Sequence, residues 1–267
     1  MTSRSKKPVQ PVTKPYLTGA PTEERTWKSA LGFFGTLVLF GIFTFLICSM
    51  MNMDSVFLRI LLNGAVEGAL LFFLFSNAAG KGAEAVARGE ILWQKQERGS
   101  FIADSERRMS YHPAKGFLVG LLGSVPLLLC AIALAIIAKR QETGIGALPS
   151  WLSNYQGRSE IGDALVAYTS QTGATAEDIL RLIVRISTMP FVSMVGATDR
   201  DGMLLLERLS PILVLLPALA YGLGYTRGPA QRSRILTGIA EGVRKQKRRE
   251  KKERKARHSS RGPEQLN

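Results

Sequence analysis

The most informative part of the chain is residues 55–80, which read SVFLRILLNGAVEGALLFFLFSNAAG. This stretch is about as long as a helix must be to cross a bilayer, yet it carries Glu67 near its middle. Arg59, Asn63 and Glu67 recur at every fourth residue, so on a helix they form one polar row. A carboxylate at that depth has to face protein or water. We therefore expect this helix to lie inside a bundle, with Glu67 as a candidate ion or proton site.

Small residues at four-residue spacing mark two candidate packing faces. They are Gly64 and Gly68 in the first stretch, and Gly116, Gly120 and Ser124 in a later one. Such spacing lets helices approach closely in lipid. If the two helices run antiparallel, Gly64 and Gly68 lie at the depth of Ala131 and Ala135, so we expect the helices to pack there.

Three further apolar stretches complete the pattern, at about 29–50, 116–138 and 203–225. The polar leader is too long for a signal peptide, and no small-residue cleavage site follows the first stretch. The sequence therefore predicts an all-α integral membrane protein with four transmembrane helices, arranged as two antiparallel hairpins within residues 27–226.

Charge predicts the orientation. The net charge is +14, and residues 1–28, 81–115 and 227–267 hold 27 of the 35 Lys and Arg residues. With four spans, all three segments lie on one side, and the positive-inside rule makes that side the cytosol. A fifth span at 179–197 would place the richest cluster outside, so it is rejected. We expect a multi-pass protein of the plasma membrane with both termini cytosolic.

The polar segments are expected to differ in structure. Residues 1–26 read as a disordered cytosolic leader, and residues 83–96 as a short amphipathic helix. Residues 141–202 form the extracytosolic segment. Within it a capping box at 175–178 precedes apolar residues at helical spacing, which predicts a surface helix over 176–189.

The cytosolic tail, residues 227–267, is expected to be disordered and polybasic. Its richest part has ten cations in fourteen residues: Arg244, Lys245, Lys247, Arg248, Arg249, Lys251, Lys252, Arg254, Lys255 and Arg257. Anionic lipid headgroups are the nearest ligand for such a segment. The tail is also similar in composition to the basic tails of membrane insertases, and this similarity implies ribosomal RNA as another partner, although the span arrangement differs.

No motif indicates an enzyme. The two cysteines lie inside apolar stretches, His112 and His258 stand alone, and phosphate-loop, dinucleotide-binding and hydrolase motifs are absent from the sequence. Residues 199–202 (DRDG) start like a calcium loop but lack the later ligands, so they predict a turn. We expect neither metal nor cofactor.

Two hypotheses for function remain. The first is a non-catalytic interaction or scaffold subunit, which meets a protein partner or a second copy through its small-residue faces while its tail binds anionic lipid or another polyanion. The alternative is a small transporter or channel component, in which Glu67, supported by Asn63 and Arg59, binds an ion or a proton.

Overall fold

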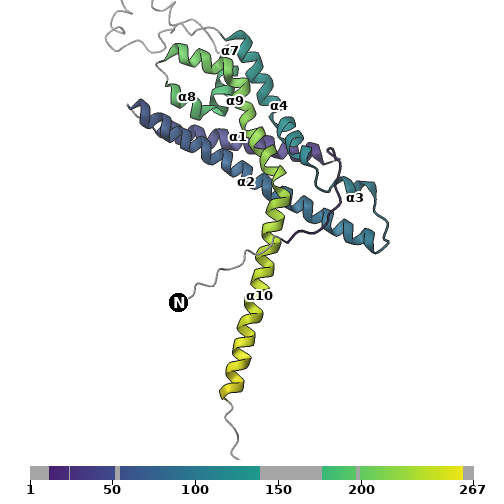
Figure 1. Cartoon of the computed structure of the whole chain (residues 1–267). Helices are drawn as coiled ribbons and strands as arrows, with labels where there is room; N and C mark the ends of the chain where they lie inside the picture. The colour runs from purple at the N-terminus through teal and green to yellow at the C-terminus, as the bar shows by residue number, and fades with distance from the viewer. Residues whose placement is uncertain (1–11, 24, 52–54, 139–175, 197–198, 261–267) are drawn as a thin grey trace, which may run out of the picture. The chain divides into compact units, whose positions relative to one another are not determined.

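The computed structural model describes residues 12–23, 25–51, 55–138, 176–196 and 199–260, and every regular element in these ranges is a helix. The long helices are α1 (Thr26–Met50), α2 (Val56–Glu97), α4 (Pro113–Ile137), α9 (Arg200–Thr226) and α10 (Gly228–Ser260) (Figure 1). The short ones are α3 (Asp104–Arg108), α7 (Ala176–Ser187) and α8 (Met189–Val195).

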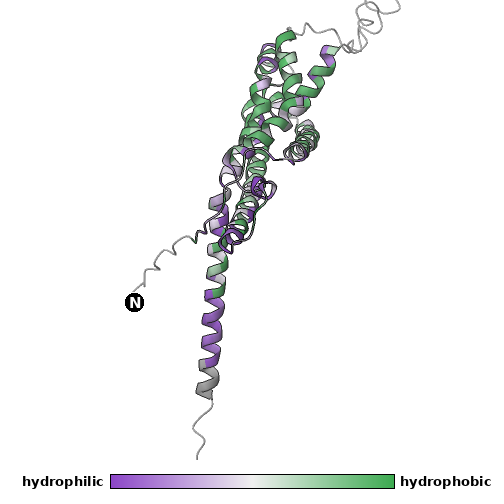
Figure 2. Cartoon of the chain, turned by 90° about the vertical axis from the view of Figure 1, so that its right-hand side faces the viewer, coloured by the Kyte–Doolittle hydropathy of each residue, from purple (hydrophilic) through white to green (hydrophobic). Residues whose placement is uncertain are grey.

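Four of the described helices, α1, α2, α4 and α9, are long and apolar enough to cross a membrane. This confirms the predicted all-helical fold with four apolar helices of spanning length. At most 33% of each helix's apolar window is buried inside the protein. Many apolar side chains of these helices are therefore exposed, which suits helices surrounded by lipid. Figure 2 shows these helices as mostly hydrophobic.

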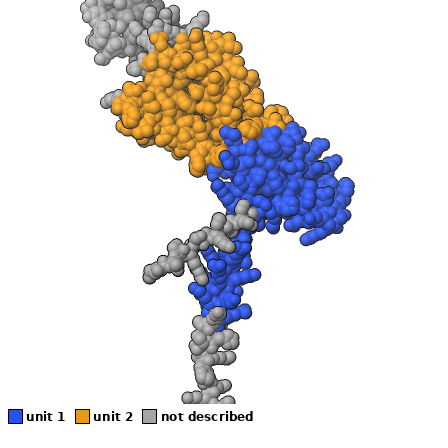
Figure 3. All heavy atoms as spheres, viewed as in Figure 1, with its two compact units in different colours: residues 1–23, 76–116, 223–267 blue, residues 24–75, 117–222 orange. Residues whose placement is uncertain are grey.

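The helices divide into two compact units, each assembled from segments that are distant in sequence (Figure 3). Unit 2 comprises residues 24–75 and 117–222, and it holds α1, α7, α8, the first half of α2 and most of α4 and α9. Unit 1 comprises residues 1–23, 76–116 and 223–267, and it holds the second half of α2 together with α3 and α10.

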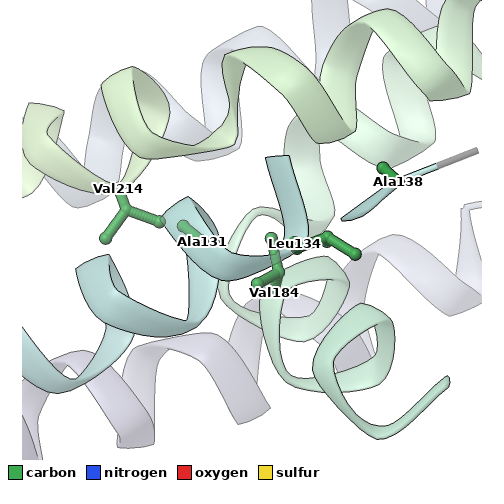
Figure 4. Packing of buried hydrophobic residues seen from close by; sticks show 5 residues of the cluster. All are labelled: Ala131, Leu134, Ala138, Val184 and Val214. Carbon is green, nitrogen blue, oxygen red and sulfur yellow. The ribbon is translucent and has the colours of Figure 1, made fainter. Parts of the chain in front are cut away.

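The core of unit 2 lies where α7 packs against α4 and α9. Ala131 and Leu134 from α4, with Ala138 just after its end, meet Val184 from α7 and Val214 from α9, and each is at most 6% exposed (Figure 4). Val184 shares the buried face of α7 with Arg181, whereas Ile179, Leu182 and Ile183 are 52%, 60% and 37% exposed. The predicted apolar stripe of α7 therefore faces outward, and the helix packs on the bundle through its other face.

The predicted surface helix over 176–189 corresponds to α7, which ends at Ser187. A second helix, α8, follows at once and was not predicted. Pro190 lies in the first turn of α8, where the N–H that proline lacks would have no partner within the helix. Residues 141–175, the first part of the predicted extracytosolic segment, lie outside the described residues.

Helix α2 is much longer than predicted. The expected span over 55–80 and the expected separate helix over 83–96 form one continuous helix of 42 residues. The helix is continuous because the glycines between the two predicted segments do not end it. Gly82 and Gly89 instead allow close contacts: a Cβ on Gly89 would lie 2.6 Å from the Leu17 carbonyl oxygen.

Unit 1 is built around the crossing of α2 with the start of α10. A Cβ on Gly82 would lie 2.5 Å from the carbonyl oxygen of Tyr225, and one on Gly228 would lie 2.5 Å from the carbonyl carbon of Gly82. The two backbones therefore touch without intervening side chains. Beside this crossing Tyr111 stacks on Tyr225, with 5.6 Å between ring centroids, and its hydroxyl donates to the Thr226 carbonyl at 3.2 Å. Burial raises the pKa of Tyr111, which keeps this donor protonated.

Residues 12–23 differ from the disordered leader that the sequence analysis expected. They form no helix, but the Leu17 amide donates to the Gly89 carbonyl at 3.1 Å and the Gly19 amide to the Tyr111 carbonyl at 2.9 Å. Glu23 forms an ion pair with Lys115, and both side chains are largely buried. Backbone hydrogen bonds to the carbonyls of Gly89 and Tyr111 hold this segment, and such bonds leave no period in the sequence by which it could be recognised. Residues 1–11 lie outside the described residues.

Candidate functional site

The predicted polybasic tail is helical rather than disordered over residues 228–260. From Val243 to Ser260 the sequence contains neither glycine nor proline, and Glu250 precedes Arg254 at the favourable four-residue spacing. Residues 244–254 hold eight of the ten predicted cations, and all eight are exposed. Figure 2 shows this part of α10 as hydrophilic. Lys255 and Arg257 continue the helix, and their side chains lie outside the described ones.

The cations of α10 occupy one side of the helix. At 3.6 residues per turn, the eight cations of residues 244–254 cover about 220° of the circumference. The remaining strip holds Gln246, Glu250 and Glu253, and towards the N-terminus it continues into Ile235 and Ile239, which are 42% and 60% exposed. Hence α10 has a cationic face, defined by those eight residues, and an opposite strip that begins apolar and ends acidic.

The start of α10 is fixed within unit 1. Glu90 on α2 accepts hydrogen bonds from Arg232 at 2.7 and 3.2 Å, and the Thr237 hydroxyl accepts one from the Val12 amide at 3.1 Å. The bonds to Glu90 raise the pKa of Arg232, so this ion pair persists at any physiological pH. The cationic face therefore extends from a helix whose first turns are fixed within unit 1. Sequence analysis missed the Glu90–Arg232 pair, because its members are far apart in the chain.

The polar row on α2 does not form one connected network. Arg59 donates from Nε to the Met194 carbonyl at 3.2 Å and from a terminal nitrogen to the Val195 carbonyl at 3.1 Å. It therefore satisfies the last carbonyls of α8. Asn63 donates to the Arg59 carbonyl at 2.8 Å and is 1% exposed, and its Oδ1 has no hydrogen-bond partner among the described residues.

Glu67 lines a cavity of about 30 Å³ within unit 2. The polar groups around it come from Thr44 on α1 and from Ser187 and Thr188 at the end of α7, and apolar residues form the rest of the wall. This volume is enough for a water molecule or a small ion. Within the described part of the chain, no cation forms an ion pair with Glu67.

The predicted packing residues have different surroundings. A Cβ on Gly64 would meet Met194 of α8 at 3.6 Å, whereas one on Gly68 would meet nothing within 4 Å. Gly120 lies against Ala218 of α9, Gly116 lies against Tyr225 in unit 1, and Ser124 is fully buried without a described partner for its hydroxyl.

The expected pairing of Gly64 and Gly68 with the small residues of α4 is therefore wrong at both glycines. Ala131, the expected neighbour on α4, belongs instead to the cluster with α7 and α9. The error arose because the sequence gives depth in the membrane but does not show which helices are neighbours.

A buried ion cluster joins α7 to α9. Glu207 is 2% exposed and accepts hydrogen bonds from Arg185 at 2.6 Å and from Arg181 at 3.3 Å. Arg181 also pairs with Glu177 at 2.6 Å. The row of Glu177, Arg181 and Arg185 was visible in the sequence, but its partner on α9 was not. Among the described residues, no group of three or more His, Cys, Asp or Glu side chains could hold a metal ion.

The fold and these sites define a helical protein with four segments suited to a membrane and one exposed cationic helix. Comparison with known proteins finds no matching family model, no matching curated protein and no matching solved structure.

Proposed function

We propose that this chain is a non-catalytic interaction subunit of the plasma membrane, with four spans, both termini in the cytosol, and α10 as its binding element. The observation that carries the proposal is the one-sided charge of α10. Eight exposed cations on one face can meet a surface of phosphates together, whereas cations spread around a helix could engage only in part.

Anionic lipid headgroups are the ligand we assign to the cationic face. Each Lys or Arg close to such a surface contributes about 1 kcal/mol. The opposite strip turns away from the headgroups in this arrangement, which keeps Glu250 and Glu253 clear of like charge. Its exposed isoleucines, Ile235 and Ile239, are then free to contact a partner protein.

Amide hydrogen exchange of the full chain in nanodiscs tests this assignment. Phosphatidylcholine discs containing phosphatidylglycerol should slow exchange over residues 244–254 relative to pure phosphatidylcholine, and high salt should reverse the effect. The triple variant Arg248→Gln, Lys251→Gln, Lys252→Gln should weaken this protection by about 100-fold, since three contacts of about 1 kcal/mol are lost.

The matched control lies on the other face of the same helix. Glu250→Gln with Glu253→Gln removes two charges nearby and should leave the protection unchanged or stronger. Equal exchange in both kinds of disc would contradict lipid binding, and protection by added ribosomal RNA in its place would assign α10 to that polyanion.

The cavity beside Glu67 favours a second candidate function, a small ion or proton pathway. The carboxylate, three hydroxyl-bearing neighbours and room for water or an ion lie together in unit 2. If this pathway operates, Glu67→Gln should abolish a pH-dependent flux in proteoliposomes without changing the thermal stability of the protein. A flux that persists in this variant would exclude Glu67 as its site.

A further inference from the structure

A second, larger hollow in unit 2 lies between the start of α2, α8 and the first half of α9. Its volume is about 700 Å³ and it is open on one side. Apolar side chains dominate its lining, among them Ile60 from α2, Met194 from α8, and Leu205 and Leu209 from α9. A pocket of this size takes a single elongated molecule rather than a helix, whose own diameter is about 10 Å.

The walls of this groove are held in place. Arg59 binds the terminal carbonyls of α8, and the Glu207 cluster attaches α7 to α9. By contrast, the groove-lining side chains of Ile60, Leu205 and Leu209 are 49%, 59% and 43% exposed. A fixed apolar groove on helices that suit a membrane fits a hydrocarbon chain.

Two charged residues line the groove, Arg59 and Asp199, and they differ in the groups that they already bind. Asp199 precedes α9 and its Oδ1 accepts a hydrogen bond from the Gly202 amide at 2.9 Å. Its negative charge therefore acts on the N-terminus of α9. Arg59 contacts only neutral carbonyls, and it has no carboxylate partner among the described residues.

The Arg59 guanidinium carries five N–H donors, of which the two carbonyls use two. An uncompensated cation beside an apolar groove attracts a molecule with an anionic head and a hydrocarbon tail. We propose that this groove binds one anionic phospholipid, with an acyl chain along α9 and its phosphate at Arg59. The inference rests on the membrane insertion in the proposed function.

Native mass spectrometry of the full chain in detergent, titrated with phosphatidylglycerol or phosphatidylcholine, tests this site. The triple α10 variant described above serves as the background, so that headgroup binding to α10 does not contribute. Phosphatidylglycerol should bind about tenfold more tightly than phosphatidylcholine, the ratio expected for one charge-assisted contact.

Two pairs of variants locate the binding. Leu209→Trp fills the groove and should abolish the tight binding, whereas Leu219→Trp, at a residue of α9 that is similarly exposed but lies outside the groove, should preserve it. Arg59→Gln should remove the preference for phosphatidylglycerol, and Arg59→Lys should restore most of it. Circular dichroism of each variant checks that the helices remain folded.

Each contrary result shows whether the lipid site or the proposed membrane function fails. Equal affinity for the two lipids, or equal behaviour of the two tryptophan variants, would overturn the lipid site. Loss of a dimer in Leu209→Trp would overturn it in favour of a second copy in the groove. Extraction of the wild-type chain from membranes by carbonate alone would instead show that the proposed membrane function fails.

Discussion

Glu207 is the buried acid through which α7 attaches to α9. It is 2% exposed and lies between Arg181 and Arg185, so both the acid and much of its surroundings are removed from water. Removing one partner from a buried ion pair leaves an uncompensated charge, which costs more than the pair contributes when intact.

We therefore expect Glu207→Gln to lower the free energy of unfolding by about 3 kcal/mol or more. Glu177→Gln makes the same chemical change at a partly exposed acid that pairs with Arg181 alone, and it should cost less than about 1 kcal/mol. Thermal unfolding in one detergent compares the two variants. Equal losses would show that Glu207 has no special role in holding α7.

For single residues, the sequence predicted which of them share a helix better than it predicted which residues they contact. The four-residue spacing correctly put Arg59, Asn63 and Glu67 on one helix. It did not predict their partners, since the guanidinium of Arg59 binds the end of α8, 135 residues away. The period of a helix is a local property that sequence records, but the carbonyls at the end of a distant short helix leave no comparable pattern.

Among the elements, α2 shows how glycine can support a helix crossing rather than end a helix. Gly80 and Gly82 are two residues apart on the same helix, yet only Gly82 touches another backbone. Sequence analysis separated the span from the following helix because it interpreted this region as a boundary. The contact with Gly228 explains why a glycine stands at position 82, and this contact arises only in the folded protein.

Alanine substitutions at these two glycines should have opposite effects. Gly82→Ala should destabilise unit 1 by about 1–3 kcal/mol, because the new Cβ meets backbone atoms that cannot move aside. Gly80→Ala meets nothing within 4 Å and should stabilise α2 by up to about 1 kcal/mol. Amide hydrogen exchange over residues 76–97 and 228–239 measures both effects. Faster exchange in both variants would contradict the crossing as the cause.

For the whole molecule, the distribution of charge is the property that sequence predicted most directly. Long apolar helices and basic segments follow from composition and period, and the structure has four such helices among its described residues. Which helix neighbours which did not follow, since lipid-facing and protein-facing apolar side chains look alike in sequence.

The predicted orientation can be measured on the intact chain. Reporter tags at residue 1 and at residue 267 should both be accessible from the cytosol, and a tag within residues 141–175 should be accessible only from outside. The reason is that the three segments that four spans would place on one side hold 27 of the 35 Lys and Arg residues. Protease protection in sealed vesicles reads out all three. Termini on opposite sides would refute the four-span topology.

Helix α8 links its own folding to the position of α2. Seven residues are too few to sustain a helix alone, and α8 depends on Arg59 of α2 to satisfy its last carbonyls. Because α2 is synthesised first, the newly made segment 189–195 can fold as soon as it reaches Arg59. A chain in which α2 is misplaced would leave this segment as unprotected backbone, which is open to proteolysis.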